Sequence, residues 1–269
     1  MKAARIGGEM RENTLKQKLE AGQAAFGVMI TFPSAPMVEM LGHLGFDWVL
    51  IDNEHGSITV ENSEDLIRAA ELSNITPIVR PVANRPEIIA PFLDRGALGV
   101  QVPHVNTAEE ARATVDAVKY YPEGHRGIFS GSRPAEYGFA GSTQDYVKQA
   151  NANTLVCLML EEVEAIDNLG ELVTVDGVDV YFIGSGDLSQ SMGYPGQQTH
   201  PEVQAQMEKG VKIITDAGRI AGCSCPDSLV PKFLDLGVQY FHSNVSRLLQ
   251  SSSNEYLKTM RQSAKAAGL

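Results

Sequence analysis

The sequence has few cysteines, no long apolar run and a shortage of positive charge, and each deficit excludes a class of protein. Three cysteines, Cys157, Cys223 and Cys225, are too few for a disulfide framework, and the Cys223-x-Cys225 spacing is not that of a zinc site. We therefore expect reduced thiols and a cytoplasmic location. Residues 1–11 are polar and lack the apolar segment of a signal peptide.

Charge and hydropathy narrow the range of partners further. The 22 Lys and Arg residues against 33 Asp and Glu residues leave a net charge of −11, which argues against nucleic acid and against an anionic membrane surface. The longest apolar runs have the length of a strand, so we predict no transmembrane span. No G-x-G-x-x-G segment follows the first predicted strand, which disfavours a dinucleotide cofactor.

Lysine is missing from the places where Schiff-base chemistry needs it. No lysine occurs between Lys18 and Lys119, and none stands at the C-terminal end of a later predicted strand. A Schiff-base mechanism requires a lysine buried at such a place, so we expect no covalent imine with substrate.

What the chain does contain is a regular alternation of short apolar runs and amphipathic segments. Strands are predicted at residues 26–31, 48–52, 77–80, 98–102, 155–160, 180–183, 220–223 and 240–242. Helices are predicted at residues 9–21, from Ser34 to near Gly42 or Gly45, and at 61–73, 86–95, 107–118, 143–151, 161–172, 201–217, 227–236 and 254–266. Eight such units without a linker predict a single (β/α)₈ barrel domain, a TIM barrel, over residues 1–269 with a short N-terminal helix. Two Gly-rich segments, 120–140 and 184–197, are predicted as loops.

Ionisable residues gather where the second and third predicted strands end, which is where a barrel carries its chemistry. Asp52, Glu54 and His55 follow the second strand, and Arg80 ends the third. A carboxylate that orients an imidazole forms a general-base dyad with it, so Asp52 and His55 are candidate catalytic residues. The alternatives are a capping Asp with a solvent-facing His, and for Arg80 an ion pair with Asp94 or Glu54.

Two carboxylates, Glu161 and Asp187, are expected at the ends of adjacent strands. With water and substrate oxygens they suit a hard divalent cation such as Mg²⁺ or Mn²⁺. Taken alone, Glu161 also suits the first turn of a helix and Asp187 a helix N-cap. The amides of Gly184-Ser185-Gly186 are candidates for holding the anionic end of a substrate. Other polar residues at predicted strand ends, without an assigned role, are Thr31, Gln101, His104 and His242.

Several phrases together resemble one known family. They are Phe46-Asp47-Trp48 through Asp52-x-Glu54-His55, Val79-Arg80-Pro81, Tyr121-Pro122-x-Gly124-x-Arg126-Gly127, Glu161 with Asp167-Asn168-Leu169, Gly177-Val178-Asp179, and Phe182-Ile183-Gly184-x-x-Asp187-Leu188-Ser189 with Gly193-Tyr194-Pro195. Over about residues 24–245 the chain is similar to the HpcH/HpaI family of metal-dependent, class II 2-oxo-acid aldolases.

The resemblance implies a (β/α)₈ barrel that cleaves a 4-hydroxy-2-oxo acid reversibly to pyruvate and an aldehyde. It implies a homo-oligomer, a trimer or a hexamer of paired trimers, with the last helix exchanged between subunits. It also implies residue roles. Glu161 and Asp187 match the ligands of a divalent metal (Mg²⁺, Mn²⁺ or Co²⁺), Arg80 the contact to the enolate oxygen, Asp52 with His55 the base dyad, Gly186 the amide that holds the carboxylate, and Asp94 a rim acid near the subunit interface.

Two departures from the family pattern concern the aldehyde. Met159 stands where the family often has Gln, and Cys223-Ser224-Cys225 stands where an apolar wall residue is usual. A thioether is a weak acceptor and no donor, so we expect hydroxyl recognition to shift to Ser224 and the loop around His125–Arg126, or to be lost. Two alternative functions are a lyase of related acyl-CoA substrates and a non-catalytic barrel that binds 2-oxo acids.

Overall fold

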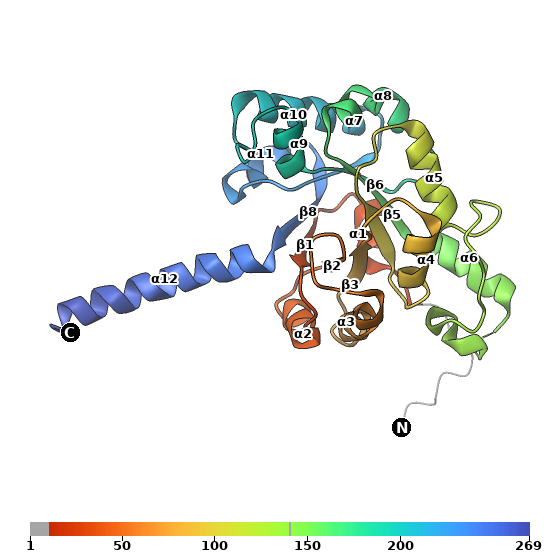
Figure 1. The fold of residues 1–269 in the computed structure, drawn as a ribbon, viewed down its shortest axis with the longest axis horizontal. Coiled ribbons are helices and arrows are strands. Elements are labelled where there is room, and N and C mark those ends of the chain that lie inside the picture. The colour runs from red at the N-terminus through yellow and green to blue at the C-terminus, as the bar shows by residue number, and fades with distance from the viewer. Residues whose placement is uncertain (1–10, 140) are drawn as a thin grey trace.

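A computed structural model describes residues 11–139 and 141–269, which form a closed eight-stranded parallel barrel. Strands pair in sequence order and β8 closes onto β1, with helices around the outside, as Figure 1 shows. The predicted TIM barrel is confirmed. The strands are β1 (Ala25–Ile30), β2 (Trp48–Asp52), β3 (Thr76–Arg80), β4 (Gly99–Val102), β5 (Leu155–Leu160), β6 (Val180–Ile183), β7 (Ile220–Cys223) and β8 (Val238–Asn244).

Helices precede the barrel and follow its strands. They are α1 (Thr14–Glu20), α2 (Ala35–His43), α3 (Val60–Leu72), α4 (Pro86–Leu93), α5 (Ala108–Val118), α6 (Thr143–Asn153), α7 (Val163–Asp167), α8 (Leu169–Leu172), α9 (Ser185–Ser191), α10 (Pro201–Asp216), α11 (Val230–Asp235) and α12 (Val245–Ala266), with 3₁₀ helices η1 (Arg133–Gly138) and η2 (Asp227–Leu229). The N-termini of α3 and α5 are both closed by capping boxes, from Thr59 with Asn62 and from Thr107 with Glu110.

The buried apolar side chains form two clusters because successive strand residues face opposite sides of the sheet. The larger cluster, with Val49, Ile51 and Phe233, joins the outer faces of the strands to the helices. The smaller cluster, with Trp48 and Tyr240, fills the barrel interior. The Trp48 and Tyr240 rings stack with centroids 4.1 Å apart, and a Cβ at Gly27 would overlap the indole, so glycine is required beside it. The interior is therefore solid below its C-terminal end.

Five predictions of helices and loops need correction. Gly-rich residues 184–197 were predicted as a loop, but they contain α9. The predicted helix 161–172 is two short helices that meet at Asn168, and 227–236 is a 3₁₀ turn followed by α11. The last helix begins at Val245 instead of residue 254. Residues 9 and 10 of the predicted first helix lie outside the described residues, and α1 begins at Thr14.

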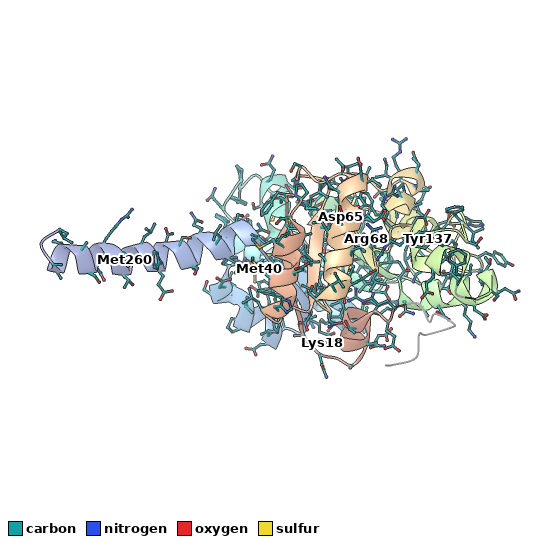
Figure 2. The ribbon with its side chains drawn as sticks, turned by 90° about the horizontal axis from the view of Figure 1, so that it is seen from below. Lys18, Met40, Asp65, Arg68, Tyr137 and Met260 are labelled. Carbon is teal, nitrogen blue, oxygen red and sulfur yellow. The ribbon has the colours of Figure 1, made fainter. Side chains whose placement is uncertain are left out.

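Helix α12 leaves the barrel after β8 and points away from it (Figure 1). Of its residues only Val245 is buried, and Leu249, Tyr256 and Met260 are each at least half exposed. Figure 2 shows Met260 far from the barrel wall. Within the described residues, no helix combines the length and the apolarity that crossing a lipid bilayer requires.

Candidate active site

The predicted site residues meet at a cavity of about 500 Å³ at the C-terminal end of the barrel. Its wall includes residues from β1, β2, β3, β5, β6, β7 and β8 or from the loops after them. Of the predicted residues, those that line it are His55, Arg80, Met159, Glu161, Gly186, Asp187 and Ser224. A larger cavity of about 790 Å³ lies elsewhere, beside Arg11 and Arg133, and contains none of the predicted site residues. Size alone therefore does not identify the site.

Arg80 is held at the cavity by a buried carboxylate on the next strand. Asp52 and Arg80 are register partners on β2 and β3. The Arg80 Nε and Nη2 atoms each lie 2.8 Å from an oxygen of Asp52, and Nε lies 3.3 Å from Glu54 Oε2. Both side chains of the Asp52–Arg80 pair are almost completely buried. Such a two-bonded geometry fixes the plane of the guanidinium.

The structure does not pair Asp52 with the imidazole of His55, as the base-dyad prediction required. Asp52 Oδ1 instead accepts hydrogen bonds from the backbone N–H groups of Glu54 (3.1 Å) and His55 (3.5 Å). The His55 side chain is 63% exposed at the cavity, and its Nε2 lies 3.8 Å from Glu54 Oε2. The nearest acid to this imidazole is therefore Glu54, because Asp52 is already bound to Arg80.

Glu161 and Asp187 both face the cavity, from the end of β5 and the first turn of α9. Burial raises the pKa of Glu161, and the charges of Asp187 and Glu54 add to this, although a hydrogen bond from His104 opposes it. Glu161 is buried and Asp187 is exposed, and two carboxylates that repel each other at one cavity form a suitable donor pair for a hard cation. Within the described residues no three His, Cys, Asp or Glu side chains form a complete ligand set, so water and substrate would supply the remaining ligands.

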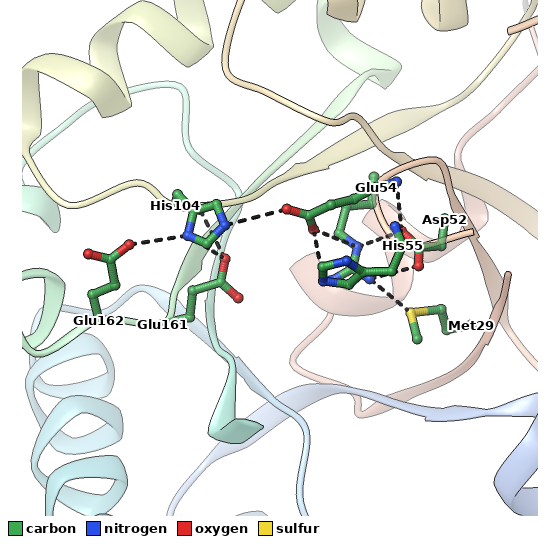
Figure 3. A network of polar contacts seen from close by, with 8 residues as sticks. Met29, Asp52, Glu54, His55, His104, Glu161 and Glu162 are labelled. Carbon is green, nitrogen blue, oxygen red and sulfur yellow. Dashed lines mark hydrogen bonds and ion pairs between the residues drawn. The ribbon is translucent and has the colours of Figure 1, made fainter. Parts of the chain in front are cut away.

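His104 is a member of the site to which the sequence assigned no role. Its backbone N–H donates to Glu161 Oε1 (3.0 Å), and its ring lies between Glu161 and Glu162 on one side and Glu54 on the other, as Figure 3 shows. Burial alone would lower the pKa of His104, but Glu161, a hydrogen bond to Glu162 and Glu54 together raise it. The signal in the sequence was its place directly after the fourth strand.

The start of α9 provides the amides that the Gly184-Ser185-Gly186 motif predicted. Gly184 is the N-cap, and Gly184, Gly186 and Asp187 line the cavity. The first N–H groups of a helix have no partner within the helix, so those of Ser185 and Gly186 can bind an anion. The Ser185 hydroxyl lies 3.3 Å from the hydroxyl of Ser224, which joins the end of β6 to the end of β7.

Asp52 and Ser185 do not line the cavity themselves but contact the lining residues Arg80 and Ser224, and three further predicted residues, Asp94, His125 and Arg126, also lie outside the lining. Asp94 ends α4 and binds Arg126 (2.6 Å), whose guanidinium lies over the Tyr120 ring. His125 pairs with Asp116. These residues do not line the cavity of this subunit, and the role of the His125–Arg126 loop in recognising an aldehyde hydroxyl stays a prediction. Further polar residues on the cavity wall, which the sequence did not reveal, are Gln198, Ser243, Asn244 and Arg247.

His242 forms part of the cavity floor as a neutral ring. It stacks on Phe182 with centroids 4.9 Å apart and meets Trp48 edge-on at 5.7 Å. Neither ring nitrogen makes a well-formed hydrogen bond within the described residues; the nearest polar group is the backbone of Ser243. Burial, and to a smaller extent the Arg80 charge, lower the pKa of His242 to about 4.

Comparison with known proteins gives one consistent result. Residues 26–246 match the model of the family described as HpcH/HpaI aldolase/citrate lyase. The chain is 38% identical over 230 residues to a hydroxypyruvate/pyruvate aldolase of Roseobacter denitrificans, covering 85% of this chain and 89% of that protein. It is 35% identical to a pyruvate aldolase of Rhizobium etli, covering 93% and 97%. An HpcH/HpaI aldolase/citrate lyase family structure from Burkholderia cenocepacia superposes with a TM-score of 0.86 at 27% identity, covering 93% of this chain and 99% of that one.

His242, a partly buried residue whose two ring nitrogens are inaccessible to solvent, predicts a loss of stability in mild acid. Its folded-state pKa of about 4 lies below the value of about 6.5 for an unfolded chain, so the unfolded state takes up the proton first. We expect this residue to cost about 2 kcal/mol of unfolding free energy between about pH 7 and pH 5. Urea unfolding of the wild type and of His242→Phe at both pH values measures this change in unfolding free energy. Equal losses in the two proteins would contradict the prediction.

Proposed function

Because the chain belongs to the HpcH/HpaI aldolase/citrate lyase family, we propose that it cleaves a 4-hydroxy-2-oxo acid to pyruvate and an aldehyde. It is a carbon–carbon lyase of the pyruvate aldolase type. The proposal depends above all on one observation. Arg80, fixed by Asp52, and the Glu161–Asp187 pair line the same cavity, so an oxyanion donor and a carboxylate pair for a cation serve one substrate.

Glu161 and Asp187 are the residues that would hold a divalent cation, Mg²⁺, Mn²⁺ or Co²⁺. Carboxylate oxygens without a His or Cys partner suit a hard ion. When bound, such a cation acts as a Lewis acid on substrate oxygens. We assign the carboxylate of the same 2-oxo acid to the adjacent amides of Ser185 and Gly186, because these N–H groups at the start of α9 have no partner within the helix and Gly186 lines the cavity.

Arg80 is the group we assign to the enolate oxygen. Its Nε and Nη2 atoms are occupied by Asp52, while within the described residues Nη1 makes no hydrogen bond to the protein. Because Asp52 holds the guanidinium, the remaining N–H groups of Arg80 keep a fixed direction. They can stabilise negative charge that develops on a substrate oxygen without first having to reorient. Met29 Sδ, 3.5 Å from Nη2, adds a soft contact on the cavity side.

The proton of the C4 hydroxyl needs an acceptor, and we assign it to Nε2 of His55. This imidazole is the most exposed part of the Asp52–Glu54–His55 segment, and it borders the cavity. An imidazole can accept a proton at neutral pH. Glu54, 3.8 Å from Nε2, is the nearest carboxylate to the imidazolium that results. Asp52 acts on this step through the backbone of His55 and through Arg80.

Two other functions fit less well. An acyl-CoA lyase would need a basic groove for the nucleotide, and the chain carries a net charge of −11. A binding barrel without catalysis would not need both the fixed Arg80 and an exposed His55 at the same cavity. Turnover of a 4-hydroxy-2-oxo acid, followed by pyruvate release, separates an aldolase from a binding protein. An aldehyde screen with pyruvate and Mn²⁺ then identifies the second product.

We further propose that the protein is a homo-oligomer in which α12 packs on another copy of the chain. Leu249, Tyr256 and Met260 recur at intervals of seven and four residues, which places them on one face of the helix. They are 62%, 64% and 50% exposed, although a helix of 22 residues with so little tertiary contact needs a partner for its apolar face. A trimer or a hexamer would provide that partner.

Activity should depend on a divalent cation because the two carboxylates lack any nitrogen or sulfur partner. We expect a chelator to abolish turnover and Mg²⁺, Mn²⁺ or Co²⁺ to restore it. Glu161→Gln should lose both turnover and tight Mn²⁺ binding, whereas Glu171→Gln, in α8, should retain both. Full turnover in a preparation shown by elemental analysis to be free of metal would contradict the proposal.

Arg80→Lys should lose most catalysis and keep the fold, since a lysine can still pair with Asp52 but cannot form the planar fork. The expected loss is about 2.7–4 kcal/mol of transition-state stabilisation, roughly 100- to 1,000-fold in kcat. The matched control is Arg85→Lys, whose side chain forms an exposed pair with Glu87. Steady-state kinetics measures the turnover of both variants, and thermal unfolding checks that they are folded. Near-native turnover of Arg80→Lys would mean that Arg80 serves only as a structural ion pair.

Truncation before residue 248 should reduce the size of the particle in solution, because it removes the apolar face of α12. Light scattering coupled to size-exclusion chromatography measures the masses of the full and the shortened chain. If the full chain is a monomer at all concentrations, the proposed oligomer is wrong.

A further inference from the structure

His104 lies at a strained point of the backbone, in the loop between β4 and α5. Its φ angle is +55°, in the left-handed region that non-glycine residues rarely occupy. This conformation directs two successive amides toward β5. The N–H of His104 donates to Glu161 Oε1 (3.0 Å), and the N–H of Val105 donates to the carbonyl of Met159 (3.2 Å). Strain of this kind persists only where the surrounding contacts maintain it.

The imidazole of His104 uses both of its nitrogens. Nδ1 lies 3.1 Å from Glu162 Oε1 and 3.5 Å from Glu161 Oε1, and Nε2 lies 3.4 Å from Glu54 Oε1. Figure 3 shows the ring between the acids of the β5 end and the acid of the β2 loop. Because the two nitrogens lie on opposite sides of the ring, one side chain reaches both groups.

The contacts of His104 connect the two halves of the site. On one side is Glu161, which we assign to the cation. On the other is Glu54, which is 3.3 Å from Arg80 Nε, the group we assign to the enolate. Glu54 is only 12% exposed, and His104 is the ion-pair partner of its Oε1 atom, while Oε2 lies near Arg80 and His55. The chain of contacts Glu161–His104–Glu54–Arg80 therefore connects two cavity-lining residues, from the end of β5 to the end of β3.

We propose that His104 is a positioning residue that holds the Glu161 carboxylate for the divalent cation, through its amide and through its ring. This inference depends on the proposed function, since it concerns the same Glu161–Asp187 pair. The amide holds Oε1 of Glu161, and the ring prevents this carboxylate from turning toward Glu162. The outer partners of metal ligands commonly change metal affinity by 10- to 100-fold, and the same scale applies here.

Two substitutions separate the contribution of the amide from that of the ring. His104→Asn keeps a residue that tolerates a left-handed backbone, but its side chain is too short to span Glu161 and Glu54. We expect its Kd for Mn²⁺ to rise about tenfold. His104→Val also disfavours the positive φ, so its amide leaves Glu161, and the rise should approach about 100-fold. Mn²⁺ binding is measured by electron paramagnetic resonance without substrate, and therefore without reference to activity.

Matched controls show whether such changes are general. Asn74→Val places a branched residue at another positive φ, of 58°, in the turn between α3 and β3. His125→Asn removes a histidine that pairs with Asp116 outside the cavity. Both controls should bind Mn²⁺ as the wild type does. Urea unfolding of each variant identifies any that fails to fold, and for His104 the Asn variant is the milder change.

Each result decides a different point. If the wild type binds Mn²⁺ and His104→Asn and His104→Val bind it equally tightly, the positioning role is overturned while the proposed function stands. An equal loss in the Asn74 or His125 control also overturns it, since the effect is then not specific to the site. If the wild type neither binds Mn²⁺ nor cleaves substrate, the proposed function fails and this inference fails with it. A graded loss confined to the two His104 variants supports it.

Discussion

The buried pair of Asp52 and Arg80 is the interaction on which the arrangement of the site depends. An isolated charge at such depth costs several kcal/mol, and the pair is tolerable only because its hydrogen bonds are nearly complete. Asp52 receives two N–H groups of Arg80 and the amides of Glu54 and His55. The pair therefore fixes a side chain on β3 and also the direction in which the chain leaves β2. Removing either partner would leave an unpaired buried charge, at a cost of roughly 3–5 kcal/mol.

Negative charge is concentrated around the cavity, and the structure balances it in two ways. Near β2 and β3, the positive charge of Arg80 neutralises the charge of Asp52 and partly offsets that of Glu54. Near β5 and β6 no basic side chain contacts Asp187 within the described residues, and Glu161 has only His104. No lysine or arginine side chain contacts either carboxylate of this second region within the described residues, which is the electrostatic argument for a cation there. His104 lies at the boundary between the two regions.

The barrel was predictable from the sequence because its strands are buried on both faces. Runs such as Leu155–Leu160 and Val180–Ile183 are continuously apolar and end abruptly, so their bounds were predicted correctly. Helix α9 was not predicted, because glycines on both sides of it suggested a loop, although only Gly186 lies inside the helix. The first two turns of α12 were also missed, since Ser251, Ser252 and Ser253 are weak helix formers and give no periodic signal.

The residues of the candidate site were predictable as a set, but not how they pair. Spacing along the chain placed Asp52 three residues before His55 and suggested that the two side chains interact. The actual partner of Asp52 is Arg80, 28 residues later, because the two are opposite each other in the register of β2 and β3. Register between strands is not visible in one sequence. His104 was overlooked for a similar reason, since its contacts come from a left-handed backbone angle that nothing in the local sequence requires.

Trp48 is the one tryptophan of the chain, and it lies in the barrel interior against Tyr240 and the edge of His242. All indole fluorescence of the protein therefore originates from a single ring directly below the cavity floor. Emission from most proteins averages several environments, whereas here it reports on one. An event that alters the floor, such as a change in the orientation or protonation of His242, changes the surroundings of that ring. The fold thus contains an optical reporter of its own interior, and no label has to be attached.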